Sequence, residues 1–249
     1  MKYLRAILLG FVQGATEFLP VSSSGHLVLL ERLGVAPPSV YFNLILHVAT
    51  LFAVLVVMRR EVRDMIRHPV KGDAKYVLVA SLPTAAIAVM LKKYLPRLFE
   101  GSLLPFGFLL TSALLLLPCL FKGRAKGERL SLPRSIGVGC MQGIAALPGV
   151  SRSGATIVAA ELMGVDPERA ARFSFLLSIP AILGGFLIEG VECGFRAEGV
   201  ETGEVVVASV VAFIGGLIAA KGMLRIVKKG LAPFAIYTFL LGIGCFFLL

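Results

Sequence analysis

The sequence predicts an all-α polytopic membrane protein with six transmembrane helices plus two re-entrant helical hairpins related as an inverted repeat. Three observations support this fold class: the composition, six long apolar segments, and a duplicated pair of interrupted apolar segments. Of the 249 residues, 57% are hydrophobic and 16% are charged, and the mean hydropathy is +0.88. Soluble domains are about half apolar and about a quarter charged. The composition therefore excludes a soluble globule, a disordered chain and a disulfide scaffold.

Six apolar segments are candidates for helices that cross the bilayer, which takes about 20 residues. They are residues 41–58, 76–91, 103–121, 172–188, 205–224 and 232–249. The second is the shortest, and we expect its helix to begin a few residues earlier. The loops between the segments are too short for a soluble domain. We therefore expect one integral membrane domain over 1–249, with a first repeat of about 1–121 and a second of about 134–249.

The two interrupted segments carry an internal repeat. Residues 10–25 and 139–154 share the pattern G-x-x-Q-G followed by V-S-x-S-G, at an offset of 129 residues. Pro, Gly and Ser break each segment in the middle, and a half-helix of about 12 residues spans only roughly 18 Å of an about 30 Å hydrocarbon core. Paired interruptions of this kind predict re-entrant hairpins whose breaks line a cavity at the repeat interface.

The net charge of +10 is explained by topology. If both hairpins return to the face they entered from, the loops 59–75, 122–134, 165–171 and 225–230 share one side and carry 15 Lys and Arg, against 7 on the opposite side. Cytoplasmic loops collect Lys and Arg, so the first side is predicted to be cytoplasmic. The expected partner of this charge is the lipid bilayer, with no nucleic acid. The expected location is the plasma membrane, with the cleft facing outward.

The first interrupted segment contains a carboxylate in an apolar setting. Gln13 and Glu17 are four residues apart, so they share one face of a helix. Glu17 is costly there unless it is paired, metal-bound or hydrated. A carboxylate at the membrane interface is the alternative interpretation. The residues that follow are the polar run Ser22, Ser23, Ser24, Gly25 and His26.

The second interrupted segment places Arg152 among small residues. Its neighbours are Ser151, Ser153, Gly154 and Thr156. A guanidinium is a natural bidentate partner for phosphate. Helices are expected to follow each break, over 27–33 and 157–163, and two helix N-termini would then converge on one anion. The alternative is that Ser-x-Ser-Gly is only a turn with helix caps.

One further pair of polar residues lies in the apolar segment 41–58. Asn43 and His47 are four residues apart and are candidates for lining the cleft. An interhelical hydrogen bond is the favoured interpretation for them.

These motifs resemble those of the undecaprenyl-pyrophosphate phosphatases of the bacitracin-resistance (BacA/UppP) type. The signatures are (E/Q)-x-x-x-E, here Gln13 with Glu17, then P-V-S-S-[ST]-G-H at 20–26 and P-G-x-S-R-S-G-x-T at 148–156. The resemblance covers essentially the whole chain. It implies hydrolysis of a polyprenyl diphosphate to the monophosphate with a divalent cation, Mg²⁺ or Ca²⁺, which recycles the lipid carrier of envelope glycan synthesis and confers bacitracin resistance. Many members have Glu where this chain has Gln13.

The resemblance and the chemistry of diphosphate hydrolysis suggest roles for the motif residues. Glu17 would hold the cation, and Arg152 with the backbone N–H groups of 151–154 would neutralise the phosphates. Ser23 is the candidate nucleophile; otherwise His26 or Glu17 would activate a water. The remaining substrate-binding candidates are Gln13, Ser22, Ser24, Gly25, Ser151, Ser153, Gly154 and Thr156.

A transporter or flippase for an anionic or lipid-phosphate substrate is the alternative function, because inverted repeats with broken helices also build secondary transporters. Fold alone does not separate the two. An acid–base set around Glu17, Ser23 and His26 favours an enzyme, since binding alone needs none. A homodimer is compatible with the sequence.

Overall fold

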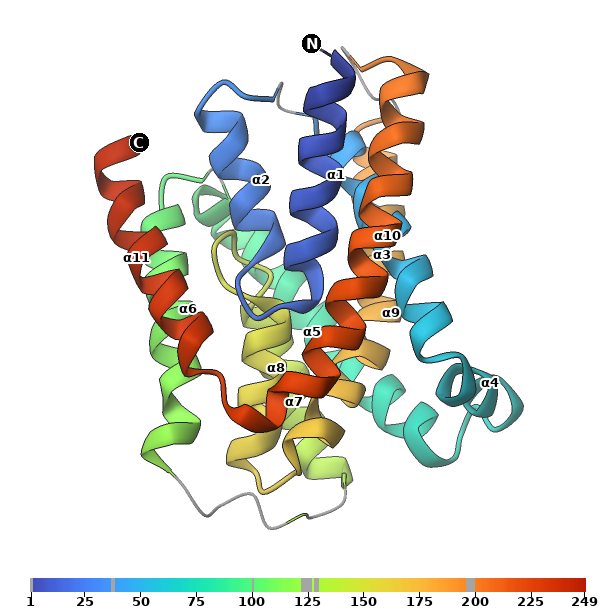
Figure 1. Ribbon diagram of the computed structural model, residues 1–249. Coiled ribbons are helices and arrows are strands. Elements are labelled where there is room, and N and C mark those ends of the chain that lie inside the picture. Colours follow the sequence, from blue (N-terminus) through green and yellow to red (C-terminus); the bar gives the residue numbers. More distant parts are fainter. Residues whose placement is uncertain (1, 37–38, 100, 122–126, 128–129, 196–199) are drawn as a thin grey trace.

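The computed structural model describes residues 2–36, 39–99, 101–121, 127, 130–195 and 200–249 (Figure 1). Every regular element in these ranges is helical. The elements are α1 (Lys2–Phe18), α2 (Ser23–Arg32), α3 (Val40–Val57), α4 (Arg59–Arg67), α5 (Gly72–Tyr94), the 3-10 helix η1 (Pro96–Phe99), α6 (Leu104–Leu120), α7 (Leu132–Ile144), α8 (Arg152–Leu162), α9 (Pro167–Glu192), α10 (Thr202–Ile226), the 3-10 helix η2 (Val227–Lys229) and α11 (Ala232–Leu248).

Each predicted apolar segment corresponds to one helix. Four helices of the described residues, α3, α5, α9 and α10 with its η2 extension, are long and apolar enough to cross a bilayer. Helices α6 and α11 are equally apolar in character but have 17 residues each. Helix α5 begins at Gly72, four residues before the predicted segment, which confirms the expected earlier start. The fold is that of an all-helical, polytopic membrane protein.

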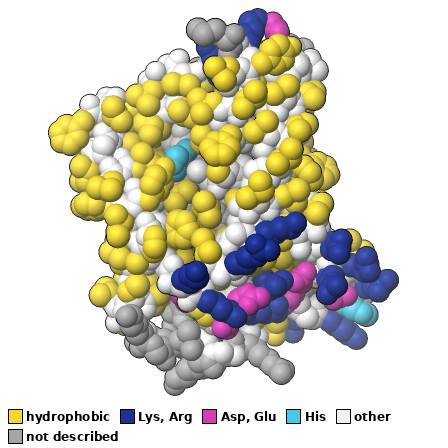
Figure 2. Space-filling model, in the orientation of Figure 1, with side chains coloured by type: hydrophobic (Ala, Val, Ile, Leu, Met, Phe, Trp, Pro, Cys, Tyr) yellow, Lys and Arg dark blue, Asp and Glu magenta, His cyan; other side chains and the backbone are white. Residues whose placement is uncertain are grey.

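The outer surface is apolar in the way a lipid-facing surface must be. Large side chains such as Leu82 and Ile218 are 73% and 69% exposed on α5 and α10. Hydrophobic side chains cover most of the visible face, and Lys and Arg gather in a band at the end of the molecule that carries α4 (Figure 2). An apolar surface of this extent is far larger than a soluble monomer tolerates.

The two interrupted segments form helical hairpins, α1–α2 and α7–α8. Helix α1 packs along α10, and α7 packs along α5. A Cβ atom at Gly10 would lie 2.3 Å from the carbonyl oxygen of Ala208, and one at Gly139 would lie 2.1 Å from that of Ala80. The repeated glycines therefore allow the backbones of paired helices to touch, as small residues do between membrane helices.

The serine motifs lie differently from the prediction. Helices were expected from residues 27 and 157, but α2 begins at Ser23 and α8 at Arg152. Ser22 and Ser151 are the N-caps, because their hydroxyls accept hydrogen bonds from the N–H of Gly25 and Gly154. Each motif is thus a cap and a first helical turn, and the chain breaks just before it. Ser22 has a φ of 68°, a left-handed conformation that costs a non-glycine residue about 1–3 kcal/mol.

An ionic cluster joins the helices at the end that carries α4. Arg172 donates to Glu61 at 2.7 Å and to Glu168 at 3.1 Å, and Lys228 donates to Glu168 at 2.8 Å. Arg169 pairs with Asp73 in the same region. These contacts tie α4, α5, α9 and η2 together at one end of the bundle. The predicted basic loop 122–134 lies largely outside the described residues.

Candidate active site

A cavity of about 410 Å³ lies between the two hairpins and helices α3, α5 and α9. Its polar end holds Glu17, His47 and Arg152 together with the serine runs 22–24 and 151–153. Its walls are mainly small and apolar side chains of α5 and α9. Lys92 and Glu189, at the C-terminal ends of those helices, also line it. Since Asp73 and Lys92 stand at opposite ends of α5, the Lys92 end lies roughly 28 Å from the ionic cluster.

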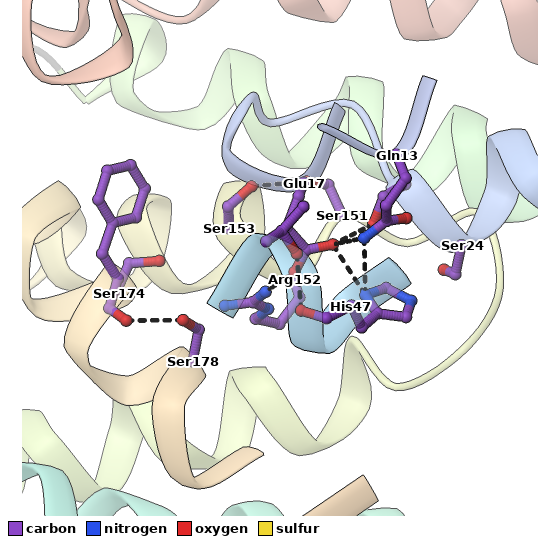
Figure 3. Close-up of polar contacts among 12 residues, drawn as sticks. Gln13, Glu17, Ser24, His47, Ser151, Arg152, Ser153, Ser174 and Ser178 are labelled. Carbon is purple, nitrogen blue, oxygen red and sulfur yellow. Dashed lines mark hydrogen bonds and ion pairs between the residues drawn. The ribbon is translucent and has the colours of Figure 1, made fainter. Parts of the chain in front are cut away.

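Glu17 is the centre of the polar end. The Oε1 atom pairs with Nη2 of Arg152, and Oε2 accepts a hydrogen bond from the Ser23 hydroxyl at 2.6 Å. Nε2 of Gln13 lies 2.9 Å from Oε2 and Nδ1 of His47 lies 3.0 Å from it (Figure 3). The carboxylate is therefore a paired, buried group between the hairpins, in the last turn of α1.

One nitrogen of the Arg152 guanidinium is unpaired. Nη2 donates a hydrogen bond to Glu17, but Nη1 is buried and has no hydrogen-bond partner. A buried donor left unpaired costs about 1–3 kcal/mol, and more when it is charged. The guanidinium also borders the cavity. An anion entering the cavity would satisfy Nη1, so the polar end is suited to bind one.

The two serine motifs meet across this cavity. The hydroxyl of Ser153 donates to the carbonyl oxygen of Leu19 at 3.0 Å, which joins the turn of one hairpin to the first turn of the other. Of the backbone N–H groups expected to bind phosphate, that of Ser151 donates to Thr111 at 2.9 Å and that of Gly154 is capped by Ser151 at 3.1 Å. One of these donors is thus used by α6 and the other by the helix cap, which leaves the Arg152 side chain as the main anion-binding group.

Several predicted site residues do not line the cavity. His26 points toward α11: Nδ1 lies 2.7 Å from the carbonyl oxygen of Ser22, Nε2 lies 2.7 Å from the Tyr237 hydroxyl, and the two rings stack. Thr156 shares a hydrogen bond with Ser174 at 2.6 Å. Gly25 and Gly154 are buried in contacts between the hairpins and α6. The structure thus brings together Gln13, Glu17, Ser23 and Arg152, but it does not bring His26 or Thr156 to them.

Two residues of the polar end stood outside the predicted site. His47 was expected to make an interhelical hydrogen bond, and it lies both on the cavity and beside Glu17. Gln142 is the repeat counterpart of Gln13; it lines the cavity, and its Oε1 is buried without a partner. The 129-residue offset could have identified Gln142. Asn43, one turn before His47, instead donates to Glu31 at 2.8 Å.

The side chains that could act as ligands of a cation lie together at the polar end of the cavity. No group of three His, Cys, Asp or Glu residues suited to a metal is present in the described part of the chain. However, Glu17 and His47 adjoin Gln13, whose Oε1 is buried and unpartnered. An amide oxygen is a normal ligand for hard divalent cations, so the residues present fit such an ion.

The family of the chain follows from comparison with known proteins. A family model described as "Bacitracin resistance protein BacA" matches residues 6–244. The chain belongs to the BacA family. Full-length relatives are named undecaprenyl-diphosphatase: one from Carboxydothermus hydrogenoformans is 40% identical over 98% of this chain and 96% of its own. One from Korarchaeum cryptofilum is 39% identical over 100% of both chains, and one from Bacteroides fragilis is 38% identical over 98% and 97%. The BacA match includes both serine motifs and every polar residue of the cavity.

Proposed function

We propose that the protein hydrolyses undecaprenyl diphosphate to undecaprenyl phosphate and inorganic phosphate. The observation that carries this proposal is the buried, unpartnered Nη1 of Arg152, a residue that lines the same cavity as Glu17 and Ser23. The full-length relatives named undecaprenyl-diphosphatase supply the substrate. Removal of the terminal phosphate would return the lipid carrier to envelope glycan synthesis. Bacitracin resistance follows from the same reaction and agrees with the family description.

The cavity suits a ligand with a charged head and an apolar tail. The diphosphate would bind at Arg152, and the prenyl chain would lie along Ala88 and Val89 of α5 and Ile182 and Phe186 of α9. A side chain added at Gly184 would meet nothing within 4 Å. The wall is therefore open there, which would let a long tail pass between helices into the lipid.

Ser23 is the proposed nucleophile. Its hydroxyl hydrogen is directed to Glu17, which leaves the oxygen lone pairs free to attack the terminal phosphorus. The new Oγ–P bond would form as the bond to the bridging oxygen breaks, with the serine proton passing to Glu17, and water would then cleave the phosphoserine. Such reactions depend mostly on positioning and charge neutralisation, which Arg152 would provide. A bound divalent cation would supply further neutralisation of the phosphate oxygens. His26, with both ring nitrogens engaged outside the cavity, has no part in this scheme.

The arrangement in the membrane is part of the same proposal: six transmembrane helices, α3, α5, α6, α9, α10 and α11, and two re-entrant hairpins in an inverted repeat. In such a repeat α1 corresponds to α7 and α5 corresponds to α10. The packing of α1 on α10 is then the counterpart of the packing of α7 on α5, and both contacts are present. The Lys and Arg band around α4 would be cytoplasmic. The opposite end, with Lys92 and Glu189, would then open the cavity to the outer face of the plasma membrane.

The test is phosphate release from a C55 prenyl diphosphate by the purified protein in detergent, with and without EDTA, beside Glu17→Ala. We expect release by the wild type only, and loss of release with EDTA. A folded, cation-loaded wild type that releases no phosphate would contradict the proposal. The transporter alternative would then be measured as flux into liposomes. It is not favoured by the names of the relatives.

A further inference from the structure

The two repeats give their serine motifs the same local structure. In each, the first serine is the N-cap of a helix. Its hydroxyl accepts a hydrogen bond from the N–H three residues later, at 3.3 Å in α2 and 3.1 Å in α8, and lies 3.5 Å and 3.3 Å from the hydroxyl of the serine two residues later. The residue directly after the cap is Ser23 in α2 and Arg152 in α8. Residues 129 apart therefore hold equivalent positions, and the two halves of the polar end can be compared position by position.

This comparison shows that the second half lacks a carboxylate. The counterpart of Glu17 is Ala146, which is exposed and lines the cavity. Helix α7 ends at Ile144, but the chain continues to turn, because the N–H of Ala146 donates to the carbonyl oxygen of Gly143 at 3.3 Å. The second repeat therefore leaves space where the first repeat presents its carboxylate.

Gln142 lacks the partners that its counterpart Gln13 has. Nε2 of Gln13 lies 2.9 Å from both Oε2 of Glu17 and Nδ1 of His47 (Figure 3). Nε2 of Gln142 lies 3.4 Å from the Thr84 hydroxyl, and its Oε1 has no hydrogen-bond partner among the described residues. The residue is only 3% exposed and lines the cavity. Because buried amides are normally satisfied, the unpaired end of Gln142 indicates a ligand.

We propose that Gln142 binds a phosphate group of the substrate, and that this phosphate takes in the second repeat the place that the Glu17 carboxylate takes in the first. In the first repeat the carboxylate is bound by Gln13 and Ser23 of its own hairpin and by Arg152 of the other. Exchanging the two repeats gives an anion bound by Gln142 and Arg152 of one hairpin and by Ser23 of the other. This inference rests on the proposed diphosphatase, whose phosphate site it completes.

The donors that such a phosphate needs are present on the α7–α8 hairpin. Nη1 of Arg152 is buried and has no partner in the described part of the chain. The amide of Gln142 can be turned by 180°, which exchanges its oxygen and nitrogen. Its NH₂ group then takes the unpaired position, and the Thr84 hydroxyl lies beside its oxygen. Since Ser23 reaches the same place from the other hairpin, the phosphorus would lie next to the proposed nucleophile.

The missing carboxylate has an electrostatic consequence. A second carboxylate at position 146 would pair with the free nitrogen of Arg152 and would repel a phosphate. With alanine there, Glu17 occupies only one nitrogen of the guanidinium, and the other is left for the substrate. Gln142 adds hydrogen bonds to the phosphate without adding a negative charge.

The first test is binding of inorganic phosphate to the full-length protein in detergent, measured as the rise in melting temperature above that in chloride of equal ionic strength. We expect phosphate to stabilise the wild type. Gln142→Ala should weaken phosphate binding, and lower kcat/KM for a C55 prenyl diphosphate, by about tenfold or more, because a hydrogen bond to a charged group is lost. Asn43→Ala removes an amide that is bonded to Glu31 outside the cavity. It is the matched control and should behave as the wild type in both measurements.

The second test restores the missing carboxylate. In Ala146→Glu the new side chain should pair with Nη1 of Arg152 and abolish the stabilisation by phosphate. Ala146→Gln adds the same bulk without the charge, so in the absence of phosphate it should melt below Ala146→Glu.

The outcomes separate the phosphate site from the activity. A wild type that phosphate stabilises no more than chloride, or Gln142→Ala with wild-type affinity, overturns the assignment even if phosphate release is normal. If Gln142→Ala does not fold, the variants at 146 decide: Ala146→Glu melting above Ala146→Gln supports the site, and equal or lower melting overturns it. Phosphate binding that depends on Gln142, in a protein that releases no phosphate from the prenyl diphosphate, would retain the site and reject the diphosphatase.

Discussion

Replacing Arg152 with lysine keeps the positive charge at the polar end of the cavity but removes the planar pair of donors. In the wild type Nη2 is held by Glu17, and Nη1 is buried with no partner. A lysine ammonium is a single point donor without the fixed fork of a guanidinium. We expect it to remain on Glu17, so that the phosphate loses the donor that Nη1 provides.

The expected fall in kcat/KM of Arg152→Lys follows from the loss of one charge-assisted hydrogen bond. Such a bond contributes about 1.5–3 kcal/mol, which corresponds to about a 10- to 150-fold fall in kcat/KM when it acts on the transition state. The folded state should be little affected, because the ion pair with Glu17 persists. Thermal melting of Arg152→Lys should therefore stay close to that of the wild type.

The assay is phosphate release from a C55 prenyl diphosphate in detergent at saturating cation. Arg172→Lys is the matched control, because Arg172 also pairs with carboxylates but lies in the ionic cluster and does not line the cavity. We expect the control to retain activity within about twofold. Wild-type kcat/KM in a folded Arg152→Lys would refute the role assigned to the unpartnered nitrogen.

Three further predictions follow from the packing and the site. Gly139→Ala should lower the thermal stability by about 1–3 kcal/mol, because its Cβ would meet a backbone carbonyl, whereas Gly222→Ala meets nothing within 4 Å and should be neutral or stabilising; equal melting of both variants would contradict the close packing. Ser23→Ala should reduce phosphate release by at least about 100-fold and abolish any phosphoserine that acid quenching of the reaction would trap. Full activity of this variant would show that water, and not Ser23, attacks the phosphorus. Tyr237→Phe removes the hydroxyl bonded to His26 and should cost about 0.5–1.5 kcal/mol of stability with little change in turnover; a large loss of turnover with normal melting would give His26 a chemical role.

Local patterns in the sequence determined the helical elements. Hydropathy alone located the six apolar helices, because a helix that faces lipid must be apolar along its length. The repeated G-x-x-Q-G and V-S-x-S-G patterns located both hairpins and the residues Glu17, Ser23 and Arg152. A charged residue in an apolar segment is costly, so Glu17 and Arg152 could be picked out from the sequence alone, and Ser23 came from the repeated motif.

Only the tertiary structure decided which polar groups meet. His47 lies 30 residues beyond Glu17 on another helix, and its place beside the carboxylate depends on how α3 is rotated against α1. His26 belongs to the same motif as Ser23, yet α2 directs it to Tyr237 and away from the cavity. The direction of a side chain around a helix axis is set by helix–helix packing, here by glycines of α1 and α7 against backbones more than 50 residues away. The sequence by itself therefore identified the helices and most of the polar residues that interrupt them, and packing determined which of those residues meet.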